Sequence, residues 1–114
     1  MKFTSSLKRN NDFKRLYSKG KSVASGYAVV FYRRNGRKEN RLGITVSTKL
    51  GGAVQRNRIR RRLKEIYRLN ESKLATGHDI VIVARGASCS AGFKQLESSL
   101  MSLFARLHLM ENAQ

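Results

Sequence analysis

The sequence contains few of the residues that supply covalent cross-links or metal ligands. Cys89 is the only cysteine among 114 residues, so the chain cannot form an internal disulfide, and a single thiol is typical of the reducing cytoplasm. The two histidines, His78 and His108, lie far from each other and from Cys89 in the sequence, which argues against a Cys/His zinc site. We therefore expect a cytoplasmic protein that holds no metal ion of its own.

Long apolar segments, proline and linker-like stretches are also missing. Apolar runs such as residues 80–84 are far too short to cross a bilayer, and residues 1–10 are basic without the apolar stretch of a signal peptide. No proline occurs, and glycine and serine are scattered rather than gathered into a linker. These features predict one domain over residues 1–114 that has no membrane partner.

Acidic residues are scarce, and the basic excess is unevenly placed. Against 24 lysines and arginines there are 7 aspartates and glutamates, which gives a formal net charge of +17. Residues 1–68 carry 20 of the basic residues and 3 of the acidic ones, so the remainder of the chain is neutral. Because 40% of the residues are hydrophobic, the chain can still bury a core. A basic surface on a neutral scaffold predicts a polyanionic partner, and it disfavours a secreted disulfide-rich protein or an ordinary small-molecule enzyme.

Helical periodicity occurs in three segments. The predicted helices cover residues 12–18, 53–69 and the apolar stripe from Phe93 to Leu107. Asn10 or Asn11 can cap the first of these helices, and Ser90 can cap the last. The order of these helices and the intervening strands predicts an α/β fold.

Strand patterns fill the intervals between the helices. Residues 27–34 are β-branched and aromatic, and residues 41–47 alternate between apolar and small residues, so we expect these two strands to form a hairpin. Residues 79–85 are apolar on both faces, which predicts a central strand. The sequence therefore predicts a small two-layer sandwich on a mixed sheet of about four strands with three helices.

The helix within residues 51–68 (GGAVQRNRIRRRLKEIYR) is strongly basic on the side that faces away from the core. Its buried stripe is expected to comprise Ile59, Leu63, Ile66 and Tyr67, and its opposite face Asn57, Arg60, Arg61, Lys64 and Arg68. Glu65 is the only acidic residue here, so intrahelical pairing cannot neutralise the arginines. Because guanidinium groups suit bidentate phosphate contacts, this helix predicts binding to a structured nucleic acid. Asn57 is either a surface residue or a contact to a base or a hydrated metal ion.

Aromatic residues accompany basic ones near the N-terminus. Phe13 and Tyr17 are one helical turn apart, and Phe31 shares a strand face with Val29. These rings either pack in the core or line a cleft in which unstacked bases of single-stranded RNA bind. The sequence shows no paired carboxylates and no Ser/His/Asp or Cys/His set, so no nuclease active site is expected in the polypeptide.

The basic helix and the segments around it resemble a known family. Residues 51–68 resemble the signature helix of the bacterial ribonuclease P protein component, with Ala53-Val54, Arg56-Asn57-Arg58, Arg60-Arg61 and Lys64 preceded by Val46-Ser47-Thr48-Lys49. Residues 7–23 and 79–85 are also similar to that family, so the resemblance covers about residues 7–107. The sequence departs from the family at Thr48, where a second basic residue is common.

This resemblance implies a fold and a function. The fold is a small sandwich like the second domain of a small-subunit ribosomal protein, with a left-handed strand–helix–strand crossover, whereas general topology rules favour a right-handed one. The implied activity is hydrolytic removal of the 5′ leader from precursor tRNA, which leaves a 5′-phosphate. A catalytic RNA subunit performs it with Mg²⁺ bound mainly by that RNA, and the protein supplies no catalytic residue.

The resemblance also implies which residues bind RNA. Its RNA-facing helix corresponds to Lys49, Arg56, Asn57, Arg58, Arg60, Arg61 and Lys64, to which helical spacing adds Arg68. Its cleft for the precursor tRNA leader corresponds to Phe13, Tyr17, Val29 and Phe31.

Two alternatives to this function remain at this stage. A structural RNA-binding protein of the ribosomal type would share the size and charge without a role in processing. A DNA-binding protein is disfavoured, because a strand rather than a helix-turn-helix precedes the basic helix.

Overall fold

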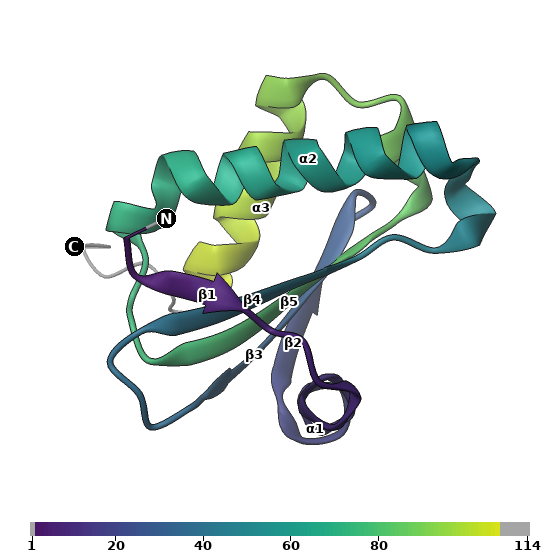
Figure 1. Cartoon of the computed structure of the whole chain (residues 1–114). Coiled ribbons are helices and arrows are strands. Elements are labelled where there is room, and N and C mark those ends of the chain that lie inside the picture. The colour runs from purple at the N-terminus through teal and green to yellow at the C-terminus, as the bar shows by residue number, and fades with distance from the viewer. Residues whose placement is uncertain (1, 108–114) are drawn as a thin grey trace.

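A mixed five-stranded sheet forms the centre of the molecule and has helices on both faces (Figure 1). The computed structural model describes residues 2–107. Its elements are β1 (Thr4–Ser6), α1 (Asn10–Lys19), β2 (Lys21–Ala24), β3 (Ala28–Arg34), β4 (Asn40–Thr45), η1 (Thr48–Leu50), α2 (Ala53–Asn70), η2 (Glu71–Lys73), β5 (His78–Ala84), η3 (Gly86–Cys89) and α3 (Phe93–Arg106). The α/β class is confirmed, and the sheet has five strands instead of about four because the short strands β1 and β2 extend its two edges.

The strand order is β1-β4-β5-β3-β2, which puts β5 in the centre. β5 is antiparallel to β3 and parallel to β4. The predicted hairpin between residues 27–34 and 41–47 is therefore wrong, because β5 lies between those two strands. The physical reason is that Ile80, Val81 and Ile82 of β5 are fully buried, so the backbone N–H and C=O groups of this strand need a strand partner on each side.

The connection from β4 through α2 to β5 is left-handed. In Figure 1, α2 lies above the sheet and β1 lies at the edge nearer the viewer. β4 runs from left to right, α2 returns from right to left, and β5 then runs parallel to β4 on its far side. This is the crossover that the family resemblance implies and that general topology rules disfavour.

Two apolar clusters lie on opposite faces of the sheet. The larger one joins α2 and α3 to the face that carries Ile80 and Ile82. The smaller one joins α1 to the other face, where Leu16 contacts Val81 and Leu7. α2 and α3 thus form the second layer of the sandwich, while α1 covers part of the opposite face and leaves Val29, Thr45 and Val83 there partly exposed.

The helix ends differ from the predicted caps. α1 begins at Asn10 with Arg9 as its N-cap, and neither Asn10 nor Asn11 caps it. α3 begins at Phe93 with Gly92 as its N-cap, because Ser90 directly follows the short turn η3 and lies before the helix. The predicted extents of the central helix and of the apolar stripe on the last helix are confirmed.

Buried polar groups attach the N-terminal strand to the end of α2. The Glu71 carboxylate accepts hydrogen bonds from the backbone N–H groups of Lys2 and Phe3, at 2.8 and 3.0 Å. The Tyr67 hydroxyl is 2.8 Å from Thr4 Oγ1 and accepts a hydrogen bond from Asn40 Nδ2 at 3.2 Å. These bonds hold β1 beside β4 although the strand has only three residues. No helix within residues 2–107 is long and apolar enough to cross a membrane.

Candidate nucleic-acid interface

α2 divides into a buried face and a cationic face, as the sequence predicts. Ile59, Leu63, Ile66 and Tyr67 are all buried against the sheet and α3. The helix starts after Gly51, whose φ of 137° lies in a region that L side chains rarely adopt. This glycine lets the chain turn from η1 into α2 directly, so Lys49 lies just before the first turn of the helix.

Most of the predicted RNA-binding side chains on and before α2 are accessible. Lys49, Asn57, Arg58, Arg61, Lys64 and Arg68 are exposed, whereas Arg56 and Arg60 are half-buried. Arg60 Nη1 donates a hydrogen bond to Asn57 Oδ1 at 2.9 Å, so the Asn57 side chain orients a guanidinium group. Arg56 Nε is buried without a hydrogen-bond partner among residues 2–107. Asn57, Arg60, Arg61, Lys64 and Arg68 thus share the side of α2 that faces away from the core, whereas Arg58 lies at its flank beside Arg62 and Arg56 is partly buried. The contact of all the predicted residues with RNA stays a prediction.

Ion pairs neutralise little of this cationic face. Within the described part of the chain, the salt bridges are those of Arg41 with Asp12 and Asp79 and that of Arg68 with Glu65. Hydrogen bonding between Arg68 and Glu65 lowers the pKa of Glu65 and raises the pKa of Arg68. Both side chains are about half exposed, so a phosphate can compete with Glu65 for Arg68.

The residues that the resemblance assigns to leader binding form a surface between α1 and the sheet. We call it the aromatic face, and it comprises Phe13, Tyr17, Val29 and Phe31. The Tyr17 ring lies 5.0 Å from the Phe31 ring in an edge-on arrangement and 6.4 Å from the Phe13 ring. Tyr17 is 43% exposed, whereas Phe13 and Phe31 are half-buried and also pack against the smaller cluster. Val29 lies on the same sheet face as Phe31, two residues earlier on β3. The rings therefore combine packing with an accessible surface, and their contact with a leader stays a prediction.

Two further residues belong to this aromatic face, and the sequence analysis missed both. Thr45 Oγ1 lies 3.3 Å from the Tyr17 hydroxyl. Val83 pairs with Val29 and, like Phe31, packs against the smaller cluster. Strand alternation alone puts each residue on one of two faces. Only the strand order, with β5 between β3 and β4, brings both to the same face as the rings.

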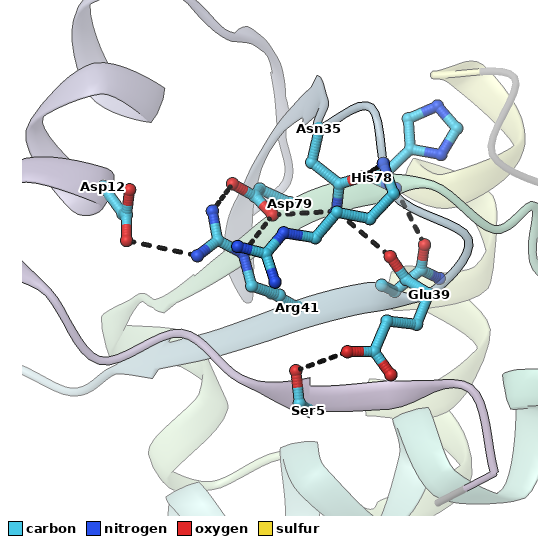
Figure 2. Close-up of polar contacts among 9 residues, drawn as sticks. Ser5, Asp12, Asn35, Glu39, Arg41, His78 and Asp79 are labelled. Carbon is cyan, nitrogen blue, oxygen red and sulfur yellow. Dashed lines mark hydrogen bonds and ion pairs between the residues drawn. The ribbon is translucent and has the colours of Figure 1, made fainter.

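An ionic network attaches α1 to the face of the sheet that it covers (Figure 2). Arg41 on β4 donates two hydrogen bonds to Asp79 on β5, at 2.8 and 2.6 Å, and one to Asp12 on α1 at 3.3 Å. Asn35 Nδ2 donates to Asp79 Oδ1 at 3.0 Å. Burial alone would raise the pKa of Asp79, but the bonds from Arg41 and Asn35 hold that pKa below its usual value. Because Asp12 precedes Phe13, the network fixes where the aromatic face begins.

The remaining titratable groups within residues 2–107 lie apart from one another. Residues 2–107 contain no group of three or more His, Cys, Asp or Glu side chains that could hold one. His78 is buried at the start of β5, where burial lowers its pKa, and Cys89 Sγ donates to the Leu50 carbonyl at 3.5 Å. His108 lies outside the described residues. We therefore assign no step to a metal ion bound by these side chains.

Comparisons with known proteins agree on one family. The family described as Ribonuclease P matches residues 1–108. A ribonuclease P protein component from Alkaliphilus metalliredigens is 41% identical over 110 residues, which cover 96% of this chain and 99% of that protein. The ribonuclease P protein of Staphylococcus aureus superposes with a TM-score of 0.85 at 34% identity and covers 96% of this chain and 98% of that one. The protein from Thermotoga maritima gives 0.83 at 34% identity, with coverages of 90% and 96%.

Proposed function

The chain belongs to the ribonuclease P protein family, and we propose that it serves ribonuclease P by holding RNA on two separate surfaces. As a member of this family it is a subunit of a tRNA-processing ribonucleoprotein. One surface is the cationic face of α2, which binds the catalytic RNA subunit. The other is the aromatic face between α1 and the sheet, which binds the leader of precursor tRNA.

The observation that carries the proposal is the unpaired charge on α2. Arg58, Arg61 and Lys64 are exposed and have no carboxylate within salt-bridge distance among residues 2–107. Cations on a rigid helix neutralise RNA phosphates and release the counterions condensed there, which favours binding. The buried stripe of α2 fixes the helix to the sheet, so these charges keep their spacing when the RNA binds.

The aromatic face explains how precursor is preferred over product. Tyr17 and Phe31 offer ring surfaces on which bases of an unpaired strand can stack. Precursor tRNA has such a strand in its 5′ leader, whereas mature tRNA has lost it. Stacking on these rings therefore adds affinity for the substrate that the product cannot gain.

Cleavage itself is assigned to the partner RNA. In this proposal a water molecule hydrolyses the phosphodiester between leader and tRNA, and the phosphate stays on the tRNA 5′ end. The Mg²⁺ for this reaction is bound mainly by the RNA subunit. The protein's contribution is to bind the leader and to neutralise nearby phosphates, with no side chain acting as acid, base or nucleophile.

The salt dependence of RNA binding tests the role of α2. If about six phosphates are neutralised, the logarithm of the association constant should fall with the logarithm of salt concentration with a slope of about −4 to −5. Arg61→Gln should reduce the magnitude of that slope by about 1, whereas Arg106→Gln, which removes an exposed arginine from α3, should leave it unchanged. A slope near zero, or equal effects of the two variants, would contradict RNA docking through α2.

A cleavage assay separates this function from that of a ribosomal-type binding protein. The protein is purified from its host with bound RNA and is assayed on a 5′-extended tRNA with Mg²⁺, before and after digestion of that RNA. We expect cleavage before digestion and none afterwards. Cleavage that survives complete removal of the RNA would contradict an RNA-catalysed reaction, and co-purified ribosomal RNA without cleavage would favour the ribosomal alternative.

A further inference from the structure

A pocket of about 400 Å³ lies at the edge of β4, between the cationic face of α2 and the ring of Phe13 on α1. We call it the edge pocket. It is lined by Thr4, Ser5, Ser6, Leu7, Phe13, Leu42, Gly43, Ile44, Arg60 and Lys64. None of these residues is acidic. Phe13 belongs to the proposed leader-binding surface, and Arg60 and Lys64 belong to the proposed surface for the catalytic RNA. The edge pocket thus lies where these two surfaces meet, and the proposed function assigns no ligand to it.

The edge pocket exists because β1 ends before β4 does. The Asn40 N–H donates to the Phe3 carbonyl at 2.7 Å, and the Leu42 carbonyl accepts from the Leu7 N–H at 2.9 Å, so Asn40 and Leu42 face β1. Ile44 is the next residue of β4 that faces this edge. The pairing of β1 with β4 stops at Leu42, which leaves the backbone N–H and C=O of Ile44 without a strand partner among residues 2–107.

One wall of the edge pocket is apolar and another is positively charged. The Phe13 ring lies directly over Gly43, where an added Cβ would come within 2.6 Å of Phe13 Cζ, so the ring forms one apolar wall. Arg60, held by Asn57, and Lys64 supply positive charge from α2. Neither cation has a carboxylate partner in the described part of the chain.

We propose that the edge pocket binds one unstacked nucleotide of single-stranded RNA. The base lies beside the Phe13 ring, and its polar edge forms hydrogen bonds with the backbone of Ile44. The phosphates on either side of this nucleotide contact Arg60 and Lys64. The two cations favour a nucleotide over an added peptide strand, for which a single free residue of β4 offers little pairing. This inference rests on the proposed function, because it places the nucleotide between the two proposed RNA surfaces.

Two RNAs could supply the nucleotide, and the experiment distinguishes them. Ser6→Phe puts a ring into the pocket from an exposed position, Ser6→Ala removes only the hydroxyl, and Ser18→Phe adds the same ring on α1 outside the lining. Affinities of the protein for catalytic RNA, and of the reconstituted holoenzyme for precursor and mature tRNA, are measured for each variant. We expect Ser6→Phe to lose about tenfold affinity in one of these measurements, and the other two variants to bind like the wild type.

Each outcome decides the inference. A loss confined to the catalytic RNA assigns the nucleotide to that subunit, and a loss for precursor but not for mature tRNA assigns it to the leader. If Ser6→Phe folds and binds every RNA as Ser18→Phe does, the edge pocket holds no nucleotide. If the wild-type protein binds neither the catalytic RNA nor precursor tRNA, the proposed function itself fails, which is a different result.

Discussion

Replacing Arg41 with leucine should destabilise the protein strongly at neutral pH and much less in acid. The substitution removes three hydrogen bonds to two carboxylates, the bidentate pair with Asp79 and the single bond with Asp12 (Figure 2). The side chains of Arg41, Asp12 and Asp79 are only 18%, 13% and 13% exposed. The two carboxylates would therefore keep their charge in a place that water reaches poorly.

The expected loss follows from the geometry. Removing one partner of a buried ion pair costs about 3–5 kcal/mol, and the partial exposure here places the effect near the lower end, at about 3 kcal/mol. With a urea dependence of about 1.5 kcal/mol per molar, the unfolding midpoint should fall by about 2 M. Arg68→Leu removes the same charge from the exposed pair with Glu65 and should leave the midpoint unchanged.

The pH dependence identifies the cause. The folded-state pKa of Asp79 is lowered, so the stability from its ionised form is present above the unfolded pKa of about 3.9 and is lost as pH falls through the lower folded value. Without Arg41, only the hydrogen bond from Asn35 and the charge of Arg37 oppose the effect of burial, so the pKa of Asp79 should be higher than in the wild type, and protonation of Asp79 should relieve the variant. Urea unfolding at pH 7 and near pH 3 should therefore show a deficit that shrinks in acid. An equal deficit at both pH values, or a loss no larger than that of Arg68→Leu, would refute this reasoning.

Two further substitutions test the packing that supports the site. Glu71→Gln should lower the free energy of unfolding by about 1–3 kcal/mol at pH 7, because the amide cannot accept hydrogen bonds from both backbone N–H groups. The loss should be smaller in acid, since the pKa of Glu71 is lowered and the stability from its ionised form disappears as pH falls. Urea unfolding checks this, with the exposed Glu39→Gln as control. Gly43→Ala should lower the free energy of unfolding by about 1–3 kcal/mol and reduce the preference for precursor over mature tRNA, because the new methyl group displaces the Phe13 ring. Gly26→Ala adds its methyl group in open space and should change neither quantity.

Sequence patterns predicted the elements better than their pairing. Periodicity located α2 and its buried stripe because both depend on local spacing along one helix. The pairing of β3 with β4 was wrong because strand alternation says which face a residue occupies but not which strand lies beside it. The apolar residues 79–85 predict a central strand, which the structure confirms, but they do not say which two strands lie beside it.

In the candidate site too, local spacing predicts the residues of one element but not the contacts between elements. The cations of α2 were identifiable because they share one helix, and the handedness of the crossover came only from the family resemblance. The contact of Tyr17 with Thr45, and the bridge from Arg41 to Asp12, join residues that are 28 and 29 positions apart. No local signal links such pairs. The edge pocket likewise depends on where β1 stops relative to β4, which follows from hydrogen bonds at the N-terminus rather than from a motif.

The most direct test of the account is the preference of the reconstituted holoenzyme for precursor over mature tRNA, measured for Tyr17→Ala and Phe3→Ala. Both substitutions remove a ring that is a little over 40% exposed, but only Tyr17 belongs to the aromatic face. If the leader stacks there, Tyr17→Ala should reduce the precursor preference by about tenfold and Phe3→Ala should leave it unchanged. Equal losses of affinity for precursor and mature tRNA in Tyr17→Ala would contradict leader binding on the aromatic face.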